Sequence, residues 1–116
     1  SKVGEGMAFA AEAKTSVAEY YSNLKALPTN NSQAGLSAPT NYARYDYIQE
    51  LRVGTVDGAI PGTITITFDI LQLGGNNLLQ LIPSTASGDQ VTWTCIAPAD
   101  FGVEDSKLPP SCRGGG

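Results

Sequence analysis

The segment Thr63-Ile64-Thr65-Ile66-Thr67-Phe68-Asp69-Ile70 decides the fold, because polar and apolar residues alternate along it without a break. Successive side chains of a β-strand point to opposite faces of the sheet. The segment therefore predicts a strand with its four apolar side chains on one face, and with the three threonines and Asp69 on the other. Such a strand suits an antiparallel sheet that is covered on one side only.

Three further segments carry strand signals, at residues 48–56, 78–82 and 91–96. Short, turn-like stretches rich in Gly, Asn, Asp and Pro connect them. These connections are Asp57-Gly58 through Pro61-Gly62, then Gly74-Gly75-Asn76-Asn77, and then Ser87-Gly88-Asp89. Because short links join neighbouring antiparallel strands, the order predicts a four-stranded meander.

The first 25 residues have a helical pattern instead. Apolar side chains recur at spacings of three, four and seven, at Val3, Met7, Ala10, Val17, Tyr21 and Leu24. Lys14 interrupts this stripe, and Pro28 ends the pattern. A helix over residues 3–25 would be roughly 34 Å long, which is more than a domain of this size needs. The Asn-, Ser- and Pro-rich stretch that follows predicts a surface loop with little regular structure.

Together these segments predict an α+β fold, in which a long N-terminal helix packs across the apolar face of a four-stranded antiparallel sheet. We expect one domain over residues 1–116. Its parts would be a helix at 1–25, a surface loop at 26–46, the sheet at 47–96, a closed C-terminal loop at 95–112, and a flexible glycine tail at 113–116.

The composition argues against most enzymes and against nucleic-acid binding. Seven basic and eleven acidic residues give a net charge of -4. This balance leaves no basic footprint for nucleic acid or an anionic membrane. Since the chain has no histidine, it cannot form a Ser-His-Asp triad, a Cys-His pair or an imidazole metal site. We therefore predict no enzymatic activity, no cofactor and no catalytic residue.

One acidic cluster could in principle hold Ca²⁺. Asp100, Glu104 and Asp105 lie close together in the sequence, and carboxylates are calcium ligands. However, the spacing of a calcium-binding loop is absent. A solvated acidic loop is the favoured interpretation, so we predict no metal site.

The two cysteines, Cys95 and Cys112, bound this acidic segment near the C-terminus. They allow a single intrachain bridge. Two buried thiols of a cytosolic protein are the alternative, but a cysteine pair near one terminus, without histidine to share a metal, favours an oxidised, exported protein. Trp93 lies two residues before Cys95 and hence on the same face of its strand, where we expect it to pack under the bridge.

The tyrosines are expected to serve packing rather than recognition. We expect Tyr21 to lie in the core. Tyr42, Tyr45 and Tyr47 are expected to fasten the loop to the sheet, since tyrosine buries its ring while its hydroxyl stays in water.

Both ends of the chain resemble the type IV pilins of class a. Residues 2–7 (KVGEGM) and 13–21 (AKTSVAEYY) are similar to the soluble half of the N-terminal pilin helix. Residues 92–95 (TWTC) and 108–112 (LPPSC) look like the disulfide-bonded C-terminal region of the same proteins. The resemblance implies that Cys95 and Cys112 are joined. It also implies that a hydrophobic, N-terminally methylated segment has been removed before Ser1, and that membrane attachment occurs only through it.

The resemblance implies a structural subunit that polymerises into extracellular fibres for adhesion and twitching motility. Its partners would be other pilin subunits, the assembly machinery, and host receptors, surfaces or phage. The subunit would reside in the inner membrane before assembly. A minor pilin, a secretion pseudopilin and a soluble disulfide-closed adhesin are the alternatives.

Two groups of residues follow from this interpretation. The helix surface around Phe9 and Ala13 would face neighbouring subunits. The loop closed by the cysteines would be the recognition surface, with Asp100, Phe101, Glu104, Asp105, Lys107, Leu108, Pro109 and Pro110.

Overall fold

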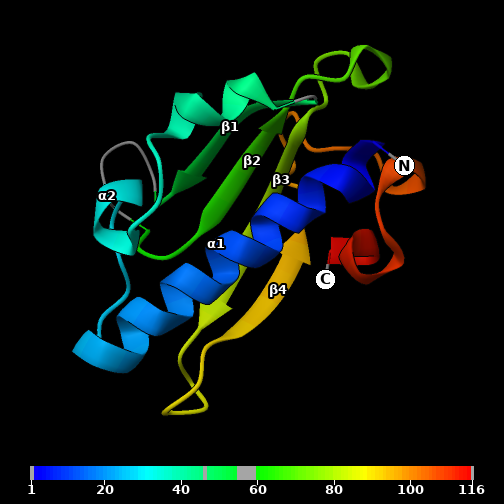
Figure 1. Cartoon of the computed structure of the whole chain (residues 1–116). Coiled ribbons are helices and arrows are strands. Elements are labelled where there is room, and N and C mark those ends of the chain that lie inside the picture. The colour runs from blue at the N-terminus through cyan, green and yellow to red at the C-terminus, as the bar shows by residue number, and fades with distance from the viewer. Residues whose placement is uncertain (1, 46, 55–59, 116) are drawn as a thin grey trace.

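The computed structural model describes residues 2–45, 47–54 and 60–115. Figure 1 shows one long helix lying diagonally across a single sheet, with the C-terminal segments beside the first turn of that helix. The helices are α1 (Lys2–Leu24) and α2 (Asn31–Ala34), and the strands are β1 (Ile48–Val53), β2 (Ile64–Phe68), β3 (Leu78–Ser84) and β4 (Thr92–Ile96). Short 3-10 helices are η1 (Pro39–Arg44), η2 (Leu71–Leu73), η3 (Asp105–Lys107) and η4 (Pro110–Gly115).

The four strands form an antiparallel sheet in the order β1-β2-β3-β4, which confirms the predicted meander. The register aligns the apolar positions across the sheet: Ile66 pairs with Leu51 on one side and with Leu79 on the other. All three side chains are fully buried. The alternation of β2 therefore places its apolar residues on the face covered by α1, as the sequence predicted.

The helix lies close against the sheet at Gly6. A Cβ at this position would run into the ring of Phe68 in β2, so only glycine fits there without displacing the ring. Val3, Ala10 and Val17 of the predicted stripe are buried, and Tyr21 is half-buried. Leu24 is 61% exposed, which corrects its assignment to the buried stripe. The sheet covers the first turns of α1, and the last turn extends past it (Figure 1).

The loop at 26–46 contains more regular structure than predicted. Its first part forms α2, whose N-cap Asn30 accepts a hydrogen bond from the backbone N–H of Gln33 at 2.8 Å. Gly35 ends α2 at φ 77°, a left-handed conformation that favours glycine. Its second part forms η1, with Pro39 at the start. The Asn- and Pro-rich composition predicted turns, but these residues also cap and start short helices.

Two other expectations are corrected. The predicted flexible tail belongs to η4 as far as Gly115, and the Arg113 Nε–H donates to the carbonyl of Leu108 at 3.0 Å. Thr63 was expected to face solvent, but it is 3% exposed, and its Oγ1 has no hydrogen-bond partner among the described residues. The neighbouring Gly62 N–H donates to the Pro28 carbonyl at 2.7 Å, which holds the loop against this end of β2.

Some predicted features lie outside the described residues. They are the turn Asp57-Gly58, the last residues of the predicted strand 48–56, and residue 116 of the tail.

Candidate functional site

The C-terminal loop is closed by a disulfide between Cys95 in β4 and Cys112 in η4. The two residues are 17 positions apart in the sequence, and their Cα atoms are 4.7 Å apart. Cys112 is fully buried, and Cys95 packs against the core that the helix and sheet share. The predicted pairing is confirmed. The bridge thus ties the end of the chain to the edge strand of the sheet.

The middle of this loop returns to the sheet beside β3. The Leu78 N–H donates to the Phe101 carbonyl at 2.9 Å, and the Val103 N–H donates to the Leu78 carbonyl at 3.0 Å. A Cβ at Gly102 would run into the backbone of Pro98, so the turn requires glycine there. Phe101 itself has φ 64°, which is unfavourable for an aromatic residue. The backbone of the loop is therefore held at three places: at both cysteines and at Leu78.

The predicted recognition residues separate into an outer and an inner set. Phe101 is 65% exposed, and Asp100, Glu104, Asp105, Lys107 and Pro110 are also exposed, while Pro109 is half-buried. Leu108 is only 3% exposed, so its assignment to the recognition surface is corrected. Together with Val103, it anchors the loop on the core. The loop has an acidic outer side around one aromatic ring and an apolar inner side.

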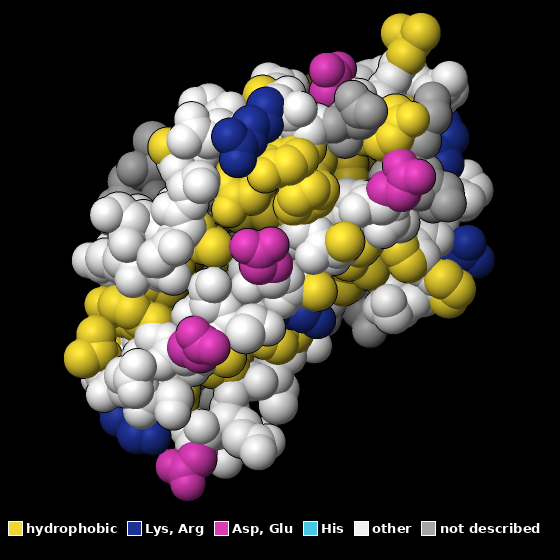
Figure 2. Space-filling view, in the orientation of Figure 1, with side chains coloured by type: hydrophobic (Ala, Val, Ile, Leu, Met, Phe, Trp, Pro, Cys, Tyr) yellow, Lys and Arg dark blue, Asp and Glu magenta, His cyan; other side chains and the backbone are white. Residues whose placement is uncertain are grey.

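The helix carries a second surface feature, an aromatic cluster. The ring centre of Phe9 in α1 lies 4.5 Å from the ring centre of Tyr45. It lies 6.3 Å from the ring centre of Tyr42, and these two rings meet edge to face. The Arg44 guanidinium lies 5.1 Å from the Tyr45 ring centre. Figure 2 shows a hydrophobic patch with a basic and an acidic side chain nearby, over the junction of α1 and η1. A cavity of about 70 Å³ is lined in part by these rings and by Glu12.

This cluster changes two expectations about the helix surface. Tyr42 of η1 and Tyr45, the residue after η1, pack against Phe9 of α1, a contact that the sequence did not predict. The expected attachment to the sheet is also present, since the Tyr47 carbonyl accepts a hydrogen bond of 2.8 Å from the Asp69 N–H next to β2. Phe9 is half-buried by Tyr42 and Tyr45 and keeps one side open. Ala13 is 1% exposed, so it does not face outward as expected. It lies three residues after Ala10 and four before Val17, on the stripe that the sheet covers.

Tyr42 is the buried member of the cluster, at 8% exposure. Burial raises the pKa of its phenol above 10.0, and the negative charge of Glu12 raises it further. The Tyr42 phenol therefore loses its proton at a lower pH in the unfolded chain than in the folded protein. We expect folding stability to fall as pH rises from 10.0 through the pKa of the folded state. Tyr42→Phe should make this fall shallower in alkaline denaturation followed by circular dichroism. Tyr20→Phe is the control, and equal curves for the two variants would contradict the assignment.

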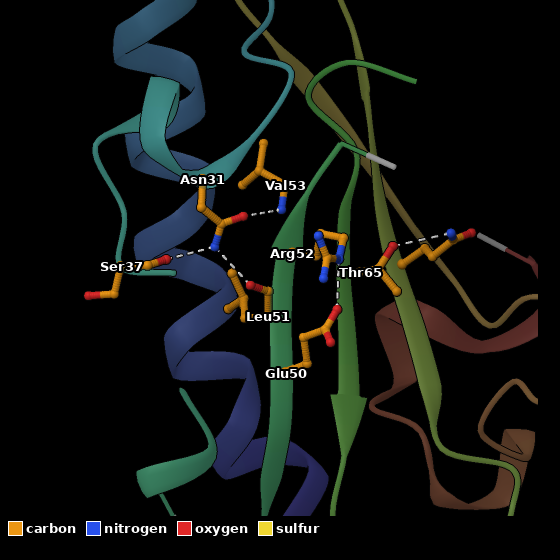
Figure 3. A network of polar contacts seen from close by, with 8 residues as sticks. Asn31, Ser37, Glu50, Leu51, Arg52, Val53 and Thr65 are labelled. Carbon is orange, nitrogen blue, oxygen red and sulfur yellow. Dashed lines mark hydrogen bonds and ion pairs between the residues drawn. The ribbon is translucent and has the colours of Figure 1, made fainter. Parts of the chain in front are cut away.

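A buried asparagine fixes the loop to the sheet, and the sequence analysis missed this role. The Asn31 amide nitrogen donates to the Ser37 and Leu51 carbonyls at 2.8 and 2.9 Å, and its oxygen accepts from the Val53 N–H at 2.7 Å. Figure 3 shows this amide between α2 and β1. Asn31 is 3% exposed. A polar residue in a polar stretch gives no sequence signal of burial, because its partners are backbone groups.

We expect Asn31→Ala to lower the free energy of unfolding by about 2 kcal/mol, since it leaves buried backbone groups without partners. Asn31→Asp should cost more, because a carboxylate oxygen would then face two carbonyl oxygens. The neighbouring Asn30→Ala removes one exposed cap and should cost about 1 kcal/mol. Urea denaturation of the three variants tests this order, and a loss for Asn31→Ala no larger than for Asn30→Ala would contradict it.

Two features are absent from the part of the chain that the structure describes. Within residues 2–45, 47–54 and 60–115, no three acidic or cysteine side chains are grouped so that they could hold a metal ion. No described helix combines the length and apolar character needed to cross a membrane. What the surface offers is an aromatic cluster on the helix and a rigidly closed loop, which are suited to contacts between proteins.

Comparisons with known proteins agree with this architecture. The sequence is similar to two type IV major pilin proteins PilE1 of Neisseria gonorrhoeae. One is 28% identical over 130 positions, covering 97% of this chain and 74% of that protein. The other is 26% identical over 128 positions, covering 97% and 69%. The sequence model of the family described as Pilin (bacterial filament) matches residues 1–113. The chain therefore belongs to the pilin family of bacterial filament proteins, which are structural subunits and not enzymes.

Proposed function

We propose that this protein is the major subunit of a type IV pilus, which serves adhesion and twitching motility. The observation that carries the proposal is the similarity to type IV major pilins over 97% of the chain. The subunit is held in the inner membrane before assembly, and the assembly machinery adds it to the surface fibre. The fibre then meets host receptors, surfaces or phage.

In this proposal, the aromatic cluster contributes to packing between subunits. Phe9 is half-buried, and Tyr45 is 37% exposed in the isolated domain. Aromatic rings that stay partly open on a monomer contribute large contact areas at protein interfaces. Arg44 and Glu12 next to them add one charge of each sign, which suits a defined orientation between neighbours.

The outer side of the C-terminal loop is the proposed recognition surface. Phe101 supplies an exposed aromatic ring, and Asp100, Glu104, Asp105 and Lys107 are exposed in the same loop. Because the disulfide and the Leu78 hydrogen bonds already fix the backbone, binding would cost little further ordering of the loop. Pro109 and Pro110 stiffen the last part of it.

The test is to express the gene, with its natural flanking sequence, in an assembly-competent bacterium whose own major subunit has been deleted. We expect sheared fibres made of this chain. Glu104→Ala combined with Asp105→Ala should leave the fibres intact and change attachment. Asp69→Ala combined with Asp89→Ala removes the same charge elsewhere and should leave both unchanged. A minor pilin would be favoured by two results together: the chain forms no fibres by itself, and only a few copies of it enter the fibres once the host subunit is restored.

A further inference from the structure

A groove of about 480 Å³ lies between the first turn of α1, η2 and the end of the C-terminal loop. In Figure 1, the first turn of α1 and the C-terminal segments lie at the same end of the molecule. Four apolar residues, Val3, Ile70, Leu73 and Leu108, line it, and each is at least 93% buried. The volume is in the range of small-molecule sites, which are typically apolar with a few polar groups at defined places.

The polar groups of this groove include two cations. The Lys107 Nζ donates to the Gln72 carbonyl at 2.9 Å, and the Arg113 Nε–H donates to the Leu108 carbonyl at 3.0 Å. These bonds hold both side chains at the groove but use only one donor of each, out of three and five respectively. Among the residues that the structure describes, no carboxylate lines the groove and neither cation forms an ion pair. The remaining donors are available to an anion.

We infer that this groove binds a single-chain alkyl anion, and that its occupant is a fatty acid. The alkyl chain would lie on the four apolar residues, and the carboxylate would accept hydrogen bonds from Lys107 and Arg113. A peptide fits less well, because the apolar lining would leave its backbone groups without partners. An anionic membrane surface also fits less well, since the domain carries a net charge of -4 and the two cations lie at a concave site.

The first test uses the unmodified protein and three probes, with binding measured by calorimetry and located by nuclear magnetic resonance. Dodecanoate, below its micelle concentration, should bind and show contacts to the methyl groups of Leu73 and Leu108. Octanoate should bind at least about tenfold more weakly, since four fewer methylene groups are buried. Dodecyltrimethylammonium, with the same chain and the opposite charge, should not bind there. Equal binding of the cation, or contacts located elsewhere on the protein, would overturn the inference.

The second test uses variants of the groove. Lys107→Gln combined with Arg113→Gln should weaken dodecanoate binding at least about tenfold. Lys25→Gln combined with Arg44→Gln makes the same charge change away from the groove and should have no effect. Ser106→Trp places a large ring at the exposed rim of the groove and should block binding without changing its charge. Melting temperatures identify variants that fail to fold. The inference would be overturned if the double variant Lys107→Gln, Arg113→Gln and the variant Ser106→Trp both fold and both bind dodecanoate with wild-type affinity.

Discussion

Replacing both Cys95 and Cys112 by alanine is expected to lower the free energy of unfolding by about 3 kcal/mol, within the usual range of 2 to 5 for a native disulfide. The bridge removes conformational freedom from the unfolded chain, and in the folded state it holds η4 against the edge strand β4. Chemical denaturation of the variant and of the oxidised wild type gives the difference directly. In the assembly experiment, the same variant should produce few fibres or none.

The matched control replaces two exposed neighbours of the cysteines, Thr94 and Ser111, by alanine. It leaves the bridge intact and should cost less than about 1 kcal/mol, as is usual at surface positions. Reduction of the wild type should reproduce most of the loss seen in the cysteine variant. A cysteine variant as stable as this control would show that the buried contacts of Val103 and Leu108 suffice to hold the loop.

Replacing Ile66 by alanine is expected to cost about 2 to 4 kcal/mol, since it opens a cavity between the sheet and α1. Ile66 is fully buried and lies between Leu51 and Leu79 in the register of the sheet. Urea denaturation, with the slope compared between variants, measures the loss.

Thr65→Ala is the control from the same strand. Thr65 points to the opposite face, where its hydroxyl accepts a hydrogen bond of 3.3 Å from the Gln80 amide. This contact is partly exposed, so we expect a loss of about 0.5 kcal/mol. Similar losses for Ile66→Ala and Thr65→Ala would contradict the assignment of the two faces.

The sequence predicted the sheet well because the evidence for it is local. The alternation in β2 identified its buried face, and the short connections identified the strand order. The helix was equally clear in its existence. The sequence did not show how much of the helix the sheet covers, because this depends on the angle at which α1 crosses the sheet. This is why Leu24 was wrongly assigned to the buried stripe. Ala13 was wrongly placed outside for a different reason: its spacing from Ala10 and Val17 already matches the buried stripe, and the prediction overlooked it.

The surface features were harder to predict, since they depend on contacts between distant segments. Phe9 was predicted to lie at the surface, but its packing against Tyr42 and Tyr45 was not predicted. Asn31 and Thr63 are buried by backbone that comes from other parts of the chain. In the C-terminal loop, most residues predicted for the recognition surface are exposed, but only the structure shows that the Leu108 side chain is buried.

The ring closed by Cys95 and Cys112 also determines how the protein would respond to pulling. If the two ends of the chain were drawn apart until the domain unfolded, the segment between the cysteines could not straighten. The stretched chain would be about 55 Å shorter than a reduced one, since an extended residue adds about 3.5 Å. A filament under tension would therefore keep the acidic, phenylalanine-bearing loop as a closed ring even where a subunit had lost its sheet.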